Sequence, residues 1–118
     1  MISIAPSSPV YLFLRPVDFR NGIDGLCAIC RQEIKKDPFS GALFVFTNKR
    51  KISIKILVYD GQGFWVHQKR MSEGKFKWWP KSDEISVPIL ARELMVLLWN
   101  GSLAKINMSP DWKKLEQE

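Results

Sequence analysis

Residues 51–70 read Lys51-Ile-Ser-Ile-Lys-Ile-Leu-Val-Tyr59, Asp60-Gly-Gln-Gly63 and Phe64-Trp-Val-His-Gln-Lys-Arg70. In the first segment apolar residues alternate with polar ones, which is the period of a half-buried β-strand. The second segment has the composition of a tight turn, and the third returns as another strand. This stretch therefore predicts an antiparallel hairpin in the middle of the chain.

The length of the hairpin loop determines which side chains share a face, because a one-residue shift turns every side chain of the returning strand over. A three-residue loop pairs Ile56 with Val66 and gives one apolar face, whereas a two-residue loop sets Lys69 on the apolar side. We expect the three-residue loop here and again at 72–74, where it leads to a third strand at 75–79. On this prediction one polar surface gathers Lys51, Lys55, Trp65, His67, Lys69, Lys75, Lys77 and Trp79.

The rest of the chain predicts a short strand at 10–14, a helix at about 19–36, an apolar strand at 42–46 and a second helix at about 88–99. Pro88 would suit the first position of that second helix, and Asp18 the N-cap of the first. The fold class is α+β: an antiparallel sheet with a β-meander over about 42–79, packed on one face by the two helices.

The chain has 118 residues, of which 46% are hydrophobic, and this is enough for one domain spanning 1–118. We expect a flexible arm at 1–8, a core at 9–99 and a polar tail at 102–118. Neither a transmembrane segment nor a secretory signal is evident in the sequence. The sequence thus predicts a soluble cytoplasmic protein without membrane contact, and it gives no indication of the oligomeric state.

Cys27 and Cys30 form a C-x-x-C motif. The spacing is compatible with a redox pair or with half of a zinc site, but His67 is the single histidine and four zinc ligands are not available. Both cysteines share a helix face with Leu26 and Ile34, so we interpret them as core residues. We expect no metal and no cofactor.

Residues 49–81 contain nine basic and two acidic side chains, a surplus of +7 against +6 for the whole chain. Basic residues interleaved with aromatic ones suit a phosphate backbone and stacked bases, although a solvated sheet face has the same composition. Both interpretations stay open. The candidate nucleic-acid-binding residues are Lys49, Arg50, Lys51, Lys55, Trp65, His67, Lys69, Arg70, Lys75, Lys77 and Trp79.

Catalytic residues are not predicted. Asp60 and Glu73 resemble the acids of a metal-dependent nuclease, but the strand between them keeps them more than ~20 Å apart. Asp18, Arg20 and Asp24 cluster near the start of the first helix and are secondary candidates for a functional site. The simpler interpretation is that the two aspartates cap the helix or pair with Arg20.

An ordered series of motifs resembles one family, the small TnpB-type accessory proteins of insertion-sequence-66-type bacterial transposable elements. The resemblance covers about residues 9–99. The motifs are Pro16-Val-Asp-Phe-Arg20, Gly22-Ile-Asp-Gly-Leu26, Asp37-Pro-Phe-Ser-Gly-Ala-Leu-Phe-Val-Phe46, Lys49-Arg50, Lys55-Ile-Leu-Val-Tyr-Asp-Gly-Gln-Gly63, Lys69-Arg70 and Gly74-Lys-Phe-Lys-Trp78.

The resemblance implies a bacterial protein that is encoded beside a separate transposase and assists transposition. It carries no established catalytic residues to transfer. We therefore expect a non-enzymatic accessory protein whose partner is DNA. The alternative is a protein-interaction module that binds the transposase without contacting DNA.

Overall fold

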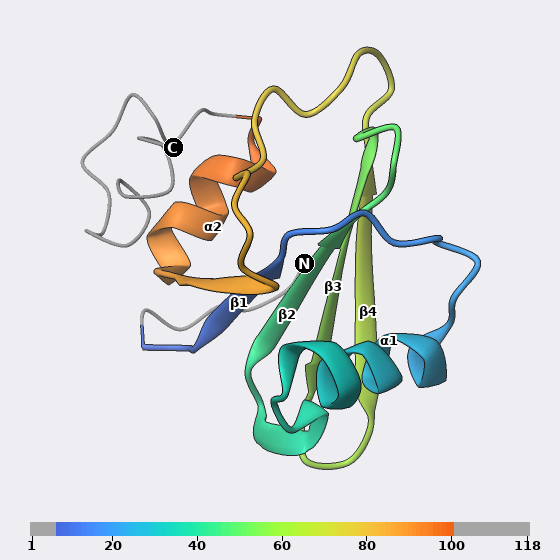
Figure 1. Cartoon of the computed structure of the whole chain (residues 1–118), viewed down its shortest axis with the longest axis vertical. Coiled ribbons are helices and arrows are strands. Elements are labelled where there is room, and N and C mark those ends of the chain that lie inside the picture. Colours follow the sequence, from blue (N-terminus) through green and yellow to red (C-terminus); the bar gives the residue numbers. More distant parts are fainter. Residues whose placement is uncertain (1–6, 101–118) are drawn as a thin grey trace.

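The computed structural model describes residues 7–100. Its framework is a five-stranded sheet in the order β4-β3-β2-β1-β5 (Figure 1). Neighbouring strands are antiparallel except β1 and β2, which are parallel, so the α+β class is confirmed and the sheet is mostly antiparallel. The strands are β1 (Val10–Phe13), β2 (Leu43–Thr47), β3 (Ser53–Tyr59), β4 (Phe64–Arg70) and β5 (Ser86–Ile89).

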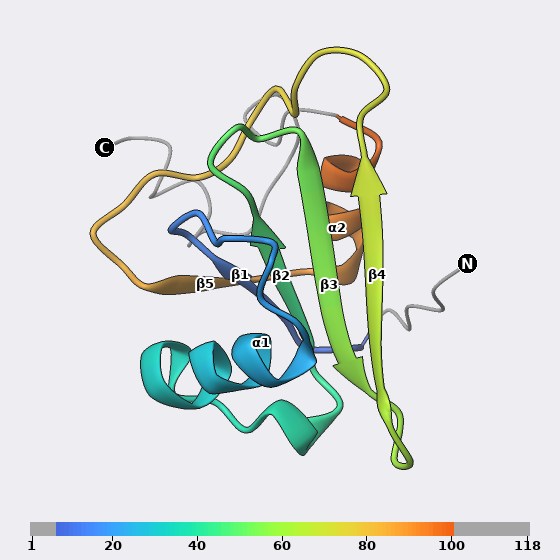
Figure 2. The same ribbon diagram turned by 90° about the vertical axis from the view of Figure 1, so that its right-hand side faces the viewer.

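The two helices cover opposite faces of the sheet (Figures 1 and 2), and the expectation of helices on one face was wrong. Helix α1 (Ile23–Ile29), which continues as one π-helical stretch at Cys30–Ile34, connects the parallel strands β1 and β2. Helix α2 (Ala91–Leu98) follows β5 and packs on the other face. The physical reason is that β2 is buried along its whole length, so both faces of the sheet need cover.

Each face of the sheet has its own apolar cluster. The α1 side contains Phe44, Phe46 and Leu57, together with Cys27 and Cys30. Both thiols are free and buried, and burial raises the pKa of Cys30 to about 12, which makes it an inert apolar side chain. The predicted core role of the two cysteines is confirmed. The α2 side is built around Leu12, Val45, Ile54, Ile56, Leu94 and Leu97.

The β3–β4 hairpin has a four-residue loop, Asp60 to Gly63, because Tyr59 pairs with Phe64. The Asp60 carboxylate accepts the backbone N–H of Gln62 and of Gly63, each at 2.8 Å, which stabilises the longer loop. The predicted three-residue loop was therefore one residue too short. As a result, every side chain of β4 lies on the opposite face of the sheet from the predicted one.

The segment after β4 is not the predicted third strand. Residues 75–79 lie in an irregular connection that runs from 71 to 85. Phe76 and Trp79 are buried in the α2-side cluster, and the Phe76 N–H donates to the Lys51 carbonyl at 2.8 Å. These two buried aromatic side chains, and not pairing with a neighbouring strand, hold the segment against the sheet.

The second helix begins later than predicted. Residues 86–89 form β5, an edge strand that pairs antiparallel with β1, and Pro88 is tolerated there because it lies on the sheet edge. Helix α2 then starts at Ala91, and the Glu93 carboxylate accepts the Leu90 N–H at 2.7 Å. The predicted polar tail at 102–118 and all but the last two residues of the arm at 1–8 lie outside the described residues.

The first helix likewise begins at Ile23 rather than at residue 19, and Gly22 occupies its N-cap position without a side-chain hydrogen bond. Asp18 is therefore not the cap of this helix. Over residues 7–100, neither helix is long and apolar enough to cross a lipid bilayer.

Candidate nucleic-acid interface

The eleven predicted nucleic-acid-binding residues do not share one face of the sheet. The even loop of the hairpin pairs Lys69 with Ile54 on the α2 side, while Lys55 pairs with Gln68 on the α1 side. The single basic surface was therefore a wrong prediction, and the cause is the one-residue error in loop length. The residues divide into three groups with different surroundings.

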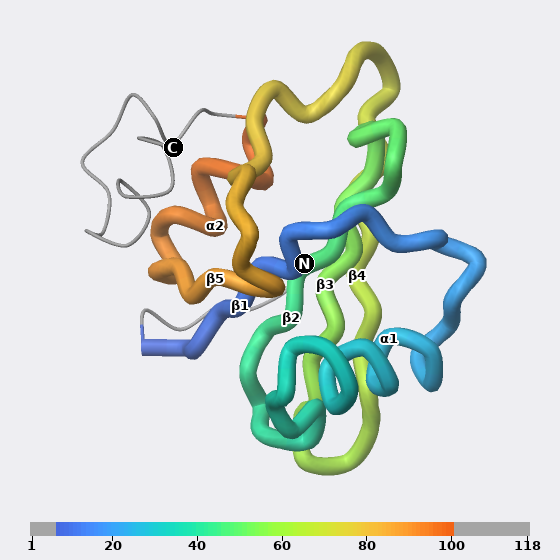
Figure 3. The backbone as a smooth tube through the Cα atoms, in the orientation of Figure 1, coloured from blue at the N-terminus to red at the C-terminus, as the bar shows by residue number. Residues whose placement is uncertain are grey.

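The first group gathers at one end of the sheet, and we call it the basic end. It combines the turn between β2 and β3 with the last residue of β4 and the segment that follows β4. These two stretches lie side by side (Figure 3), joined by hydrogen bonds from Met71 N to Ile52 O and from Phe76 N to Lys51 O, both at 2.8 Å. The basic end consists of Lys49, Arg50, Lys51, Arg70, Lys75 and Lys77.

The backbone of the basic end is well fixed. The Asn48 side-chain oxygen accepts the N–H of Ile52 at 3.0 Å and that of Ser53 at 3.3 Å, which closes the turn before β3. On the other stretch, the Asn100 side chain accepts the Lys77 N–H at 2.7 Å and donates to the Lys75 carbonyl. The basic side chains thus project from an ordered backbone.

These side chains are also uncommitted. All but the half-buried Lys51 are exposed, and none of the six forms a side-chain hydrogen bond or an ion pair with any part of residues 7–100. Glu73 is the single acidic residue within the two stretches, 48–53 and 70–77. The basic end is therefore a concentrated positive patch whose charges are available to a partner.

Lys55 belongs to a second group, in which the cation serves the fold. Its ammonium donates to the Phe19 carbonyl at 2.8 Å and to the Asn21 carbonyl at 3.5 Å. It also lies 4.8 Å from the centroid of the Phe19 ring. Lys55 thereby ties the loop before α1 to the sheet.

On the opposite face, Lys69 has a comparable role. Its ammonium donates to the Leu98 carbonyl at 2.6 Å and lies 4.8 Å from the Trp99 ring, at the C-terminal end of α2. A cation at this position satisfies a helix-end carbonyl and interacts favourably with the helix dipole. Beside it, the rings of Trp65 and His67 stack with centroids 5.8 Å apart.

Lys69, His67 and Trp99 line an apolar groove of about 360 Å³ between the hairpin and α2, and Trp65 stacks on His67. Trp65 is 55% exposed, and the Asp60 carboxylate holds its indole N–H at 2.7 Å. The same carboxylate accepts the Gly63, Trp65 and Gln62 N–H groups, and these hydrogen bonds lower the pKa of Asp60. The floor and rim of the groove include Ile54, Ile56, His67, Lys69, Met95, Leu98 and Trp99.

Trp79 forms the third group by itself. It is only 6% exposed, and its indole N–H donates to the Phe13 carbonyl at 3.3 Å. Its predicted place on the polar surface, available for stacking on a base, was therefore wrong. Because residues 71–85 form an irregular connection, strand alternation does not determine which residue of the pair Trp78-Trp79 is buried.

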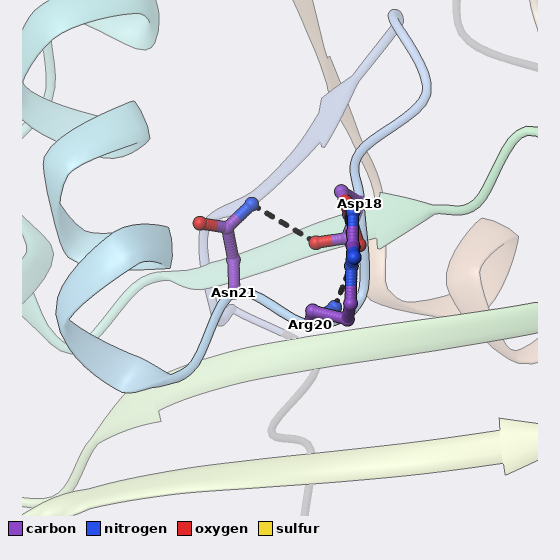
Figure 4. A network of polar contacts seen from close by, with 3 residues as sticks. All are labelled: Asp18, Arg20 and Asn21. Carbon is purple, nitrogen blue, oxygen red and sulfur yellow. Dashed lines mark hydrogen bonds and ion pairs between the residues drawn. The ribbon is translucent and has the colours of Figure 1, made fainter.

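The three secondary candidates, Asp18, Arg20 and Asp24, do not all contact one another. Arg20 and Asp18 form an exposed ion pair on the loop before α1, and Asn21 completes a small polar network with them (Figure 4). Asp24 is exposed in the first turn of α1 and takes no part in that network. The predicted pairing of Asp18 with Arg20 is confirmed.

The Asp18 loop lies close to the basic end. Asp18 and Phe19 line a cleft of about 440 Å³ together with Asn48, Lys49 and Arg50. The cleft lies where the parallel strands β1 and β2 end, because both loops follow the carboxyl ends of those strands. The charged residues of this cleft were candidates in the sequence, but their proximity was not predicted. It depends on the parallel pairing of β1 with β2.

The structure also adds residues that the sequence did not suggest. Trp99 and Met95 lie exposed beside the groove, and Asn48 and Asn100 fix the backbone of the basic end. The one signal for Trp99 in the sequence is that it is a large aromatic residue at the predicted end of the second helix. Among residues 7–100, no group of three or more acidic, cysteine or histidine side chains is placed to hold a metal ion.

The fold and this site define a small, basic α+β protein with a cation-rich sheet end. Residues 8–107 match the family described as IS66 Orf2 like protein, and the chain belongs to this family. Family membership points to a transposition-associated accessory protein.

Two similar proteins come from Sinorhizobium fredii, and both are uncharacterized. The protein y4jC is 35% identical over 82 residues, which cover 68% of this chain and 70% of that protein. The protein y4hO is 30% identical over 89 residues, covering 75% and 76% of the two chains. No solved structure matches this chain.

Proposed function

We propose that this protein is a non-enzymatic accessory factor that assists transposition by binding DNA through the basic end. The observation that carries the proposal is the gathering of six basic residues on two hydrogen-bonded stretches, with one acidic residue among them. In this proposal the protein acts in the bacterial cytoplasm, where both DNA and the transposase of the element are present.

The physical basis is the release of counterions from DNA. Each phosphate neutralised by a Lys or Arg side chain releases condensed cations, and the resulting affinity falls steeply with salt. Side chains that are exposed and unpaired can contact phosphate without first breaking an internal bond. Lys55 and Lys69 are excluded from this role because their ammonium groups are already bound to backbone carbonyls.

The absence of catalysis is supported by the positions of the acidic residues. Asp60 lies in the turn before β4 and Glu73 in the segment after it, and the Asp60 carboxylate is bound by the N–H groups of its own turn and of Trp65. A nuclease or transferase site would need acids that converge on one phosphate. We infer that chemistry on DNA is left to a separate transposase.

The test is the binding of a 30-base-pair duplex, measured by fluorescence anisotropy over a series of salt concentrations. Removing four exposed charges of the basic end should lower the affinity about a hundredfold at low salt. The slope of log affinity against log salt should fall by about 3–4, since each phosphate contact contributes about 0.9. The variant carries Lys49→Ala, Arg50→Ala, Lys75→Ala and Lys77→Ala.

A control with the same net charge separates local contact from overall charge. It removes four cations on or beside the helices, away from the basic end, and should retain most of the affinity and the salt slope of the unchanged protein. Equal losses in both variants, or no binding by the unchanged protein at low salt, would contradict the proposal. The control carries Arg31→Ala, Lys35→Ala, Lys36→Ala and Arg92→Ala.

A second function, binding to the transposase without DNA contact, is favoured by the apolar groove. Exposed Trp65, Met95 and Trp99 beside it have the composition of a protein interface. A complex with the element's transposase that survives nuclease treatment and high salt, and is lost on Met95→Glu, would support this function. Under the same conditions a DNA-mediated complex would dissociate.

A further inference from the structure

The loop before α1 presents one arginine in a fixed orientation. The Asp18 carboxylate accepts Nε of Arg20 at 3.0 and 3.1 Å, and Nη2 at 2.6 Å (Figure 4). It also accepts the backbone N–H of Arg20 at 2.9 Å, so one carboxylate holds both ends of the residue. The guanidinium plane is thereby set by a bidentate pair rather than left to rotate.

The backbone beneath this pair is fixed from several directions. The Asn21 side chain donates to the Asp18 carbonyl at 2.9 Å, and the Val17 N–H donates to the Thr47 carbonyl at 2.8 Å. Lys55, on β3, donates to the Phe19 carbonyl at 2.8 Å and to the Asn21 carbonyl at 3.5 Å. The loop is therefore anchored to β2 and β3 on both sides of the arginine.

The bonds to Asp18 leave one side of the guanidinium unused. Arg20 has five N–H donors, and Nε together with one hydrogen of Nη2 is engaged. Both hydrogens of Nη1 and the second hydrogen of Nη2 remain, and the side chain is 92% exposed. Two parallel donors at the end of a planar fork match the O6 and N7 acceptors that guanine shows in the major groove.

We propose that Arg20 reads a guanine in the major groove, held in position by Asp18, while the basic end binds the adjoining phosphates. This proposal rests on the proposed function, since it assumes that DNA is the partner. The cleft shared by Asp18, Phe19, Lys49 and Arg50 places the loop beside the phosphate-binding residues. Arg20 is thus the specificity residue, and Asp18 is a positioning residue.

Stability alone does not account for this arrangement. An exposed ion pair contributes little to folding, because solvent screens it and the ordering of both side chains opposes it. Ordering the arginine in advance reduces the entropy lost when it binds, which favours recognition by a planar fork. A bidentate contact of this type discriminates guanine from other bases by about 5- to 150-fold.

The test is selection from a random-sequence duplex library, followed by sequencing and by affinity measurements on the enriched duplex. The unchanged protein should enrich guanine at one position or more, and replacing that guanine by 7-deazaguanine, which lacks N7, should lower affinity at least fivefold. Arg20→Ala should remove both the enrichment and the sensitivity to 7-deazaguanine. Asp18→Asn should reduce the preference several-fold, and Arg31→Ala, a matched exposed arginine, should retain it.

Three outcomes overturn the inference. Binding without any guanine preference in the unchanged protein overturns it and leaves the proposed function standing. An Arg20→Ala variant that loses affinity equally for all sequences, with the salt slope reduced by about 1, shows a phosphate contact instead. No binding to any duplex overturns both proposals. Circular dichroism of each variant checks that the exposed substitutions leave the fold intact.

Discussion

The β3–β4 hairpin and the basic end carry the same types of side chain but use them differently. In the hairpin, Lys55 and Lys69 donate to the carbonyls of Phe19 and Leu98, so each ammonium joins the sheet to a loop or a helix end. At the basic end the side chains reach solvent with no hydrogen bond or ion pair to residues 7–100. One set of cations stabilises the fold, and the other is available to a partner.

The difference follows from the position of each residue relative to the core. A lysine within a strand that is covered by a helix can use its stem as apolar surface and its ammonium as a donor to nearby carbonyls. A lysine on a turn beyond the end of the sheet has no such carbonyls within reach. A local surplus of charge in the sequence therefore overstates the surface that can bind a polyanion.

The largest expected effect comes from removing the anchor of the segment that carries Lys75 and Lys77. Trp79→Ala should lower the free energy of unfolding by about 3–5 kcal/mol, because it leaves a large cavity and removes the donor to the Phe13 carbonyl. Urea denaturation followed by circular dichroism measures this. Trp65→Ala, at an exposed site of the hairpin, is the control and should cost less than about 1 kcal/mol; a similar loss in both would contradict the division between core and surface tryptophans.

The next effect separates the two sets of lysines directly. Lys69→Met should lower the free energy of unfolding by about 1–2 kcal/mol, since the Leu98 carbonyl and the Trp99 ring lose their cation. Lys77→Met should change stability by less than about 0.5 kcal/mol but weaken DNA binding several-fold. Thermal unfolding and anisotropy on the same two proteins test both halves. A Lys69 variant that loses DNA affinity at unchanged stability would reverse the assignment.

Much of the fold was predictable because strand periodicity and turn chemistry are local. The strand at 64–70 was predicted with its observed bounds, and the apolar strand predicted at 42–46 lies one residue from the observed β2. The buried face with Cys27 and Cys30 followed from helical spacing alone. Such features need no knowledge of what packs against them.

The candidate site was less predictable, because it depends on one residue of loop length and on long-range pairing. The Asp60 carboxylate stabilises a four-residue loop, and this exchanges the faces of Lys69 and Gln68. The pairing of β1 with β2 brings the Asp18 loop to Lys49, across about thirty residues of sequence. The pairing of β1 with β2 leaves no local trace in the sequence.

A smaller effect concerns the turn that leads into the basic end. Gly74 has φ of 72°, a conformation that disfavours a side chain, although an added Cβ would meet nothing within 4 Å. Gly74→Ala should therefore cost about 1 kcal/mol through backbone strain alone. Gly63→Ala, in the hairpin loop with no positive φ and equal space, should cost clearly less. Equal costs in urea denaturation would mean that the turn at Gly74 relaxes without strain.

The smallest effect is the pH response of the loop beside the basic end. Arg20, through its side-chain and backbone hydrogen bonds, lowers the pKa of Asp18 from 3.8 to about 2. Because the pKa is lower in the folded protein, this contribution to stability is present above about pH 4 and is lost as the pH falls towards 2. Carboxyl NMR titration should give a midpoint near 2 for Asp18, and Arg20→Ala should return it towards 3.8. A midpoint near 3.8 in the unchanged protein would show that the guanidinium is not held by Asp18 in solution, and the orientation proposed for reading guanine would then lose its support.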